Sequence, residues 1–230
     1  MNWTNDRTIF TEEYIHTSKQ IYDNLFQEKG LLQGNVIDVG GGWGLFRQWW
    51  NPGESGIFVV HDPGVDRFIE GPHQLHRMFY EQAMSLPMTF VEGFGEELFY
   101  KDDSFDTCLI ASTLDHCVAP QQLFAEAYRC LRPGGGILIF QDCETPQMVK
   151  KDTFLKRLNK YIFDPRRLFR AVYGKLIYGN PHLHHFTCAE IISWLEDAGF
   201  RNIEVSLITE TSAVYQFQAI KVERLSDNDQ

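Results

Sequence analysis

The sequence predicts an α/β fold with a doubly wound, mostly parallel sheet of about seven strands and one antiparallel edge strand. Short apolar runs alternate with segments of helical periodicity through most of the chain, which is typical of parallel strands joined by crossover helices. Glycine and proline signals separate these elements, as in the turn at residues 132–136. The last two apolar runs follow a capped helix directly, so they predict an antiparallel pair at the sheet edge.

The first elements follow this alternation. An amphipathic helix is expected over residues 12–29, and Gly30 is expected to end it. Strands are then expected at residues 36–39, 57–61, 88–91, 105–111 and 136–141. Helices are expected at residues 45–50 and 120–131, with helical stretches in the connection 71–86.

The C-terminal part carries an explicit helix start. Thr187 is followed three residues later by Glu190, which is the pattern of a capping box. It predicts a helix over residues 187–198 that ends at Gly199. The closing strands are expected at residues 202–209 and 213–220.

Residues 142–186 do not fit a minimal unit of sheet and helices. A structureless loop of this length is uncommon inside a compact domain, so we expect a helical lid of about two or three helices. Residues 1–30 are expected to form an N-terminal helical segment. The whole chain, residues 1–230, is expected to form a single domain.

Composition and charge limit the class of protein. With 43% apolar residues and a formal net charge of −10, the chain is globular and lacks the basic balance that general nucleic-acid binding requires. Its apolar runs stay well below the roughly 20 residues of a membrane span, and its first residues do not resemble a signal peptide. Five cysteines without a Cys-x-x-Cys pair indicate free thiols and no structural zinc site. We therefore expect a cytoplasmic protein with no nucleic-acid partner and no transmembrane segment.

The charge is uneven along the chain. Residues 150–175 contain nine basic and two acidic residues, with aromatic side chains among them. One interpretation is a lid that binds an anionic or lipid-linked substrate, or an acidic membrane surface. The other is a pair of amphipathic helices with a solvated basic face and aromatic residues that pack inward.

A glycine-rich turn after the first strand of the predicted sheet indicates a ligand site. The strand carries Asp38 near its end, and glycines follow at alternate positions: Gly40, Gly42 and Gly44. Glycines let the backbone approach a ligand closely. The third glycine of the dinucleotide-binding pattern would fall on Leu45, and an acid before the turn suits a cationic amino group better than a pyrophosphate. The ligand that this pattern indicates is S-adenosylmethionine.

Several motifs, in this order, resemble those of class I S-adenosylmethionine-dependent methyltransferases of the small-molecule kind grouped as type 11. The matching segments are Val36–Gly44, Asp62 at the end of the second strand, Val91–Leu98, Asp103–Asp106, Cys130–Gly135 and the segment from His184 to Phe200. The good match covers about residues 30–145. The resemblance implies a Rossmann-like fold and methyl transfer to a small-molecule acceptor, with oxygen ahead of nitrogen or carbon as the accepting atom.

The resemblance also implies roles for particular residues. Gly40, Gly42 and Gly44 leave room for the methionine part of the cofactor, and Asp38 contacts its ammonium group, directly or through water. Asp62 accepts hydrogen bonds from both ribose hydroxyls, since a carboxylate has several lone pairs.

The adenine end departs from the family pattern. Phe94 stands where many relatives have an Asp that meets the adenine amino group. We expect backbone at Phe94 and Gly95 to hold the adenine, with the Phe94 ring stacking on it or lining the pocket. Glu96 is either a substitute acceptor or a solvated helix residue. Ser112 is also assigned to cofactor binding, and Trp43 either packs over the cofactor or turns into the core.

Methyl transfer from a sulfonium is an in-line displacement that chiefly requires positioning, and oxygen or nitrogen acceptors often need a base as well. His116 follows the fourth strand and is the first candidate for that base, with Asp115 orienting it or binding substrate. His185 is a further catalytic candidate. It belongs to a group with His182 and His184 that also suggests metal ligands, but no acid stands beside them, so no metal site is expected.

Two other classes of function are weighed against a methyltransferase. A non-catalytic relative would keep the cofactor loop and bind the cofactor or a partner without transferring a methyl group. A nucleotide-dependent oxidoreductase is disfavoured by the glycine spacing. Enzymes that methylate amino groups of nucleic acids and proteins carry an Asn-Pro-Pro-Tyr motif at the position of residues 112–115. This chain lacks that motif, which favours a small-molecule acceptor.

Overall fold

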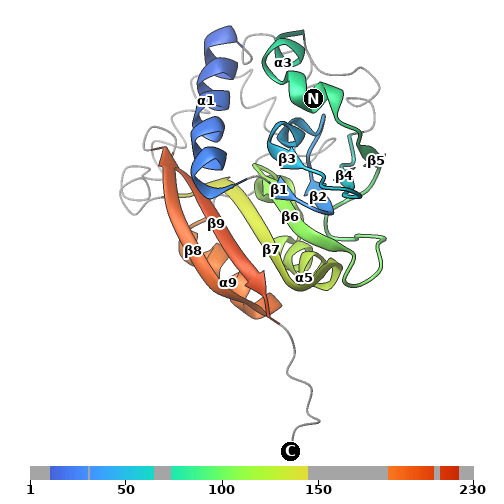
Figure 1. The fold of residues 1–230 in the computed structure, drawn as a ribbon. Coiled ribbons are helices and arrows are strands. Elements are labelled where there is room, and N and C mark those ends of the chain that lie inside the picture. Colours follow the sequence, from blue (N-terminus) through green and yellow to red (C-terminus); the bar gives the residue numbers. More distant parts are fainter. Residues whose placement is uncertain (1–10, 31, 65–73, 145–185, 210–212, 223–230) are drawn as a thin grey trace, which may run out of the picture.

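A seven-stranded sheet forms the centre of the computed structural model (Figure 1). The structure describes residues 11–30, 32–64, 74–144, 186–209 and 213–222. The strand order is β5-β4-β2-β6-β7-β9-β8. The strands are β2 (Val36–Val39), β4 (Phe58–His61), β5 (Thr89–Val91), β6 (Phe105–Ala111), β7 (Leu131–Asp142), β8 (Phe200–Thr209) and β9 (Val214–Lys221).

The strands from β5 to β7 run parallel, and β9 pairs antiparallel with both β7 and β8. The antiparallel strand therefore lies immediately inside the edge strand β8. A separate parallel pair joins β1 (Leu32–Gln33) to β3 (Trp50–Asn51). The register places Val39 of β2 beside His61 of β4 and Ile110 of β6, so the carboxyl ends of these strands lie level with one another.

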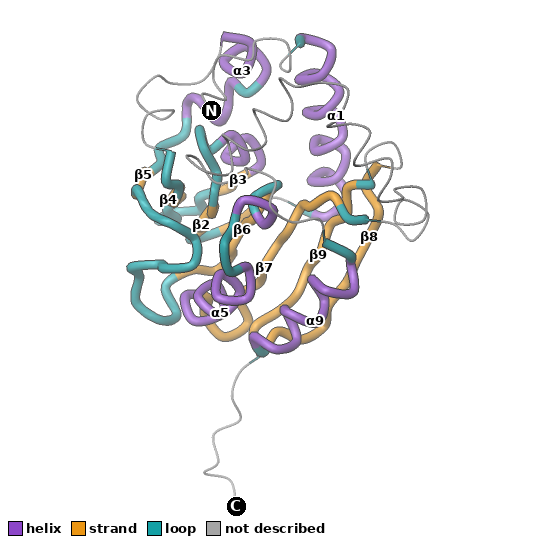
Figure 2. Tube along the Cα trace, turned by 180° about the vertical axis from the view of Figure 1, so that it is seen from behind, coloured by secondary structure: helices purple, strands orange, loops and turns teal. Residues whose placement is uncertain are grey.

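Helices cover both faces of the sheet (Figure 2). On one face lie α1 (Glu12–Lys29), the 3-10 helix η2 (Leu45–Trp49), α3 (Gln74–Phe79) and α4 (Glu81–Ser85); on the other lie α5 (Pro120–Cys130) and α9 (Cys188–Ala198). Successive residues of a strand point to opposite faces, and Val36 and Ile37 accordingly belong to different apolar cores. The predicted doubly wound, Rossmann-like α/β fold is confirmed.

Helix ends follow their sequence signals. The Thr187 side chain accepts a hydrogen bond from the backbone of Glu190, whose side chain accepts one from the Thr187 backbone, so the predicted capping box starts α9. Gly199 ends this helix with a φ of 106°. Gly30 likewise ends α1, where its N–H donates to Phe26 O.

The start of β7 differs from the sequence expectation. The strand begins at Leu131, which pairs with Phe105 of β6, and the glycines expected to form a turn lie within it. The pairing shifts register between Phe105 and Thr107, so an irregularity in the ladder accommodates the glycine-rich residues. Residues 92–104, which connect β5 to β6, contain no helix.

The predicted lid, the basic segment within it and the three candidate histidines at 182, 184 and 185 lie outside the described residues. At the borders of that segment the Glu144 N–H donates to Phe186 O at 2.8 Å, so its two ends meet. The five cysteines are free thiols. Within the described ranges, no helix combines the length and the apolar character needed to cross a membrane.

Candidate cofactor and acceptor site

The strand order defines a crevice at the carboxyl ends of β2 and β6. The chain builds the sheet outward from β2 through β4 to β5 and then returns to β6 on the other side of β2. In open α/β sheets, ligands bind outside the carboxyl ends of the strands where the order reverses in this way. The glycine-rich turn after β2 lies at this point.

The glycine-rich turn depends on backbone conformations that favour glycine. Gly40, Gly42 and Gly44 have φ values of 71°, 52° and 63°. The Gly40 N–H donates to His61 O at 2.8 Å and ties the turn to the end of β4. A Cβ at Gly40 would overlap the Thr113 side chain, whereas a Cβ at Gly42 would meet nothing within 4 Å. The turn therefore packs closely on Thr113, just after β6, at Gly40 and borders open space at Gly42.

Asp38 lies beneath the turn and is fully buried. Neither of its carboxylate oxygens has a hydrogen-bond partner among the described residues, and a Cβ at Gly41 would overlap the carboxylate. Burial raises the pKa of Asp38 to about 8, with a further contribution from Asp62, while Arg47 opposes the shift. An unpaired buried carboxylate is unfavourable, and the ammonium group of S-adenosylmethionine would supply the missing partner. The residues present thus fit the methionine end of that cofactor.

Asp62 follows β4 and is also buried. Its Oδ2 accepts a hydrogen bond from Gly42 N at 3.0 Å, and its Oδ1 accepts one from Gly64 N at 2.6 Å. These bonds fix the carboxylate against the glycine turn. Because a carboxylate oxygen has two lone pairs, each oxygen can still accept a bond from a ribose hydroxyl. The structure therefore brings Asp38, Asp62 and the glycines together, as the sequence predicts.

Arg47 is a buried cation of this site that was not predicted from the sequence. Its guanidinium donates to the carbonyl oxygens of Gly44, at 3.0 Å, and of Leu86. Burial lowers the pKa of Arg47, and the charge of Asp38 opposes that effect. Arg47 thus holds the end of the glycine turn and supplies positive charge near Asp38. Trp43, in the turn itself, packs its ring against His76 of α3 at a centroid distance of 5.2 Å.

The loop after β5 supplies the expected adenine end. The Phe94 ring is 68% exposed, and its carbonyl oxygen accepts a hydrogen bond from His61 Nε2 at 3.2 Å. A Cβ at Gly95 would overlap Leu123, so the backbone packs directly on the core there. The Glu96 carboxylate accepts bonds from the N–H groups at the start of α5, the shorter being 2.8 Å to Val118 N. Glu96 therefore anchors this loop to α5, a role that neither sequence interpretation included.

His61 is a second residue that the sequence reading missed. It is fully buried between the strand end and the loop, and its Nδ1 lies 3.0 Å from the Tyr100 hydroxyl. Burial lowers the pKa of His61 despite the opposing effects of the Phe94 carbonyl and Asp62, so the ring is neutral. A carbonyl can only accept, so Nε2 carries the proton and Nδ1 accepts from Tyr100. A polar ring within an apolar strand, directly before the acid, is the sequence signal for it.

The end of β6 carries the remaining candidates. Ser112 is exposed, has a φ of 51°, and donates its N–H to Phe140 O at 2.8 Å. The Thr113 hydroxyl lies 3.2 Å from Val39 O and 3.1 Å from Ala111 O, so Thr113 ties β6 to the end of β2. Thr113 was not predicted, because its contact partner on β2 is far away in the sequence.

Asp115 and His116 lie in the short 3-10 helix η3 (Leu114–His116) that follows β6. Asp115 is buried, and the His116 side chain is 39% exposed. Their Nε2 and Oδ1 atoms are 3.8 Å apart, a distance for charge attraction rather than a hydrogen bond. The third catalytic candidate, His185, is outside the described residues. No group of three or more His, Cys, Asp or Glu side chains that could hold a metal ion occurs in the described part of the chain.

The comparisons with known proteins all match methyltransferases. The model of the methyltransferase domain family Methyltransf_11 matches residues 37–139. The chain is 36% identical over 52% of its length to 2-methyl-6-phytyl-1,4-hydroquinone methyltransferase 2, chloroplastic, of Oryza sativa subsp. japonica, covering 33% of that protein. It is 22% identical over 69% of its length to 2-methoxy-6-polyprenyl-1,4-benzoquinol methylase, mitochondrial, of Dictyostelium discoideum, covering 50% of it. The chain thus spans half or less of the length of these relatives.

A solved structure shares the fold. Haemonchus contortus phospholethanolamine N-methyltransferase 2, in complex with phosphomonomethylethanolamine and S-adenosylhomocysteine, superposes with a TM-score of 0.59 at 17% identity. The similarity covers 95% of this chain and 60% of that one. The fold, the glycine turn and the paired acids, together with the match over residues 37–139, support a class I S-adenosylmethionine-dependent methyltransferase.

The affinity for S-adenosylhomocysteine, which carries the same ammonium group as the donor, should depend on pH through Asp38. Because the cation needs the ionised carboxylate, affinity should rise with pH up to about 8 and then level off. Below that pH, each unit of acidification should lower the affinity by up to about tenfold. Calorimetry in buffers of different ionisation enthalpy would measure affinity and proton release together, and D38N should bind more weakly without this pH dependence.

The stability of the unliganded protein should depend on pH in the opposite direction to the affinity. Because its pKa is raised by folding, Asp38 keeps a proton in the folded chain that the unfolded chain has lost, so the free energy of unfolding should fall as pH rises from about 4 to about 8. D38N should remove this part of the slope in urea unfolding. Equal slopes for the wild type and D38N would contradict the assignment.

Replacing His61 should weaken cofactor binding through the adenine loop. H61F keeps an aromatic ring but removes the hydrogen bonds to Phe94 O and to the Tyr100 hydroxyl, each of which contributes about 0.5–1.5 kcal/mol. We expect at least about a tenfold weaker Kd for S-adenosylhomocysteine by calorimetry.

Two variants control for this prediction. Y100F removes only one of the two hydrogen bonds and should show a smaller effect than H61F. H16F makes the same substitution on α1, away from the loop, and should leave the Kd unchanged. An H61F protein that binds as tightly as H16F would show that His61 does not position the loop.

Proposed function

We propose that this protein transfers a methyl group from S-adenosylmethionine to a hydroxyl oxygen of a small aromatic acceptor of the quinol class. The donor half rests on one observation: the buried Asp38 carboxylate, unpartnered within the described residues, beside Asp62 and the glycine turn. The acceptor half is supported by the Oryza sativa and Dictyostelium discoideum relatives, which are named for a hydroquinone and a benzoquinol.

Exposed apolar side chains near the strand ends suit an aromatic acceptor. Phe94 is 68% exposed and Val118 is 83% exposed. The Glu96 carboxylate, two residues from Phe94, accepts the Val118 N–H at 2.8 Å and so keeps the two segments close together. An apolar rim of this kind favours a ring over a charged acceptor, because burial of apolar surface stabilises the complex.

In this proposal the two ends of the crevice have separate tasks. When bound, S-adenosylmethionine supplies a methyl group on a positively charged sulfur. Asp38 and Asp62 hold the donor, which leaves the methyl group to meet an acceptor near the end of β6. As the oxygen–carbon bond forms and the carbon–sulfur bond breaks, the acceptor hydroxyl loses its proton. The products are S-adenosylhomocysteine, the methyl ether and that proton.

His116 is the residue we assign to take the proton. Its imidazole is partly exposed at the end of β6, and an acceptor can approach it from the solvent side. The Asp115 carboxylate at 3.8 Å stabilises the imidazolium once it forms. General-base assistance of this kind contributes about 10²–10⁴-fold to a rate.

Incubation with methyl-labelled S-adenosylmethionine and 2-methyl-1,4-hydroquinone tests the proposal, with an aliphatic alcohol and an aliphatic amine as comparison acceptors. Label is expected in the methyl ether of the hydroquinone. In H116A, turnover should fall by about 10²-fold or more while the Kd for S-adenosylhomocysteine stays within about twofold of the wild type. H16A, an α1 variant outside the site, should retain full turnover.

The outcomes separate the parts of the proposal. Binding of S-adenosylhomocysteine without transfer to any acceptor would favour the non-catalytic relative. Transfer to the ring carbon of the hydroquinone would overturn oxygen as the accepting atom. Unchanged turnover in H116A would overturn only the role of His116.

A further inference from the structure

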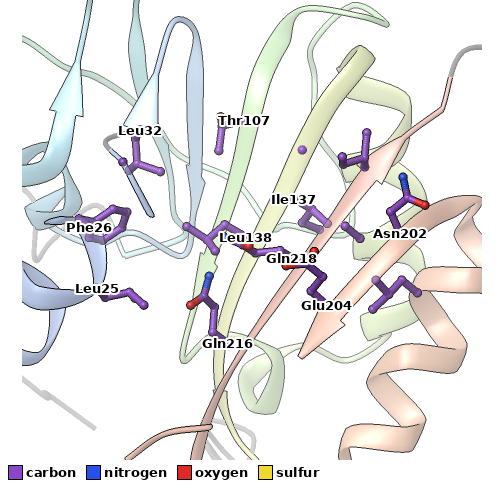
Figure 3. A pocket seen from close by; sticks show the side chains of 15 residues that line it. Leu25, Phe26, Leu32, Thr107, Ile137, Leu138, Asn202, Glu204, Gln216 and Gln218 are labelled. Carbon is purple, nitrogen blue, oxygen red and sulfur yellow. The ribbon is translucent and has the colours of Figure 1, made fainter. Parts of the chain in front are cut away.

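A cavity of about 660 Å³ lies between the C-terminal end of α1 and the strands β7, β9 and β8 (Figure 3). It is lined at Thr107, near the start of β6, and at Gly136 of β7, whereas the cofactor crevice lies beyond the carboxyl ends of the strands. Leu25 and Phe26 of α1 form one wall, and residues of β8 and β9 form the other. The volume is within the range of small-molecule sites, about 300–1,000 Å³.

The cavity contains a buried polar group that lacks a partner. Gln216 of β9 is 2% exposed and lines the cavity, and its Oε1 has no hydrogen-bond partner among the described residues. Its neighbour Phe217 packs into the core on the α5 and α9 side, so Gln216 points to the α1 side, where the cavity lies. A buried amide oxygen without a donor is unfavourable, and a ligand N–H or O–H group would satisfy it.

The lining also indicates which ligand suits the cavity. The wall is apolar where Leu25, Phe26 and Leu138 contribute to it. The amide of Gln218, which pairs with Leu138 in the sheet, and the carboxylate of Glu204 line the same space. Among the described residues of the lining, Glu204 is the only charged one, and none of them is Lys, Arg or His. This favours a hydrogen-bond donor with positive charge and disfavours an anion.

We propose that this cavity is a second small-molecule site, which binds an apolar amine with its ring or hydrocarbon body against α1 and its ammonium group between Gln216 and Glu204. The site is independent of methyl transfer, because it uses none of the residues that surround the glycine turn. The ammonium group donates hydrogen bonds to the Gln216 amide oxygen and pairs with the Glu204 carboxylate.

Three probes with one ring system and different head groups test the proposal: 1-naphthylmethylamine, 1-naphthalenemethanol and 1-naphthoic acid. Their affinities are measured by calorimetry on the full chain, with and without saturating S-adenosylhomocysteine. The amine should bind at least about tenfold more tightly than the acid, with the alcohol between them, and S-adenosylhomocysteine should not displace it.

Two variants locate the binding. Q216L replaces an amide whose oxygen is unsatisfied, so it should fold with a melting temperature no lower than that of the wild type. It should weaken amine binding by about tenfold or more. E204Q, at an exposed position, should bring the affinities for the amine and the alcohol to within about twofold of each other.

Q121L is the matched control for Q216L, since it makes the same substitution on the exposed start of α5, and it should bind the amine as the wild type does. Equal affinity of the amine for Q216L and Q121L would overturn the site. Tighter binding of the acid than of the amine would overturn the ligand class. These measurements need neither donor binding nor methyl transfer. They can therefore fail or succeed independently of the proposed methyltransferase function.

Discussion

The structure depends on placing two carboxylates at the ends of adjacent buried strands. Asp38 of β2 and Asp62 after β4 both lie in the interior, and burial together with the charge of Asp62 raises the pKa of Asp38. The surrounding chain offsets this cost with backbone N–H groups at Asp62 and with the buried cation Arg47 near Asp38. Backbone can reach Asp62 only if the turn folds back over the strand ends, and the positive φ values at Gly40 and Gly42 permit that path. The conformation of the glycine turn therefore lets the backbone stabilise the buried Asp62 carboxylate.

The site is also stiffened by contacts between segments that are remote in the sequence. His61 joins β4 to the loop that follows β5, and Thr113 joins the end of β6 to the end of β2. Glu96 joins the same loop to the start of α5. Each of these side chains satisfies backbone groups that would otherwise be left unpaired where the strands end. Together they make the crevice a preformed feature of the sheet, as is usual for small-molecule sites.

The sequence predicted those parts whose signals are local. The capping box at Thr187 and the acid followed by alternate glycines each fall within one short stretch, and the structure contains both features. Arg47 and His61 were missed because their roles come from carbonyl groups that only folding brings near. The start of β7 was placed too late because pairing at Leu131 overrode a glycine-rich stop signal. The unpartnered amide in the second cavity likewise has no sequence signature, since it requires knowledge of burial.

The hydrogen bond from Glu144 N to Phe186 O has a consequence for how such a chain can evolve. It brings together the two borders of a long segment, so β7 and α9 are joined at a fixed point whatever stands between them. Doubling the length of an intervening segment changes its closure free energy by only about 0.6 kcal/mol. A change in the length of that segment therefore carries only a small closure cost for the sheet and the donor crevice, as long as this hydrogen bond holds the two borders together.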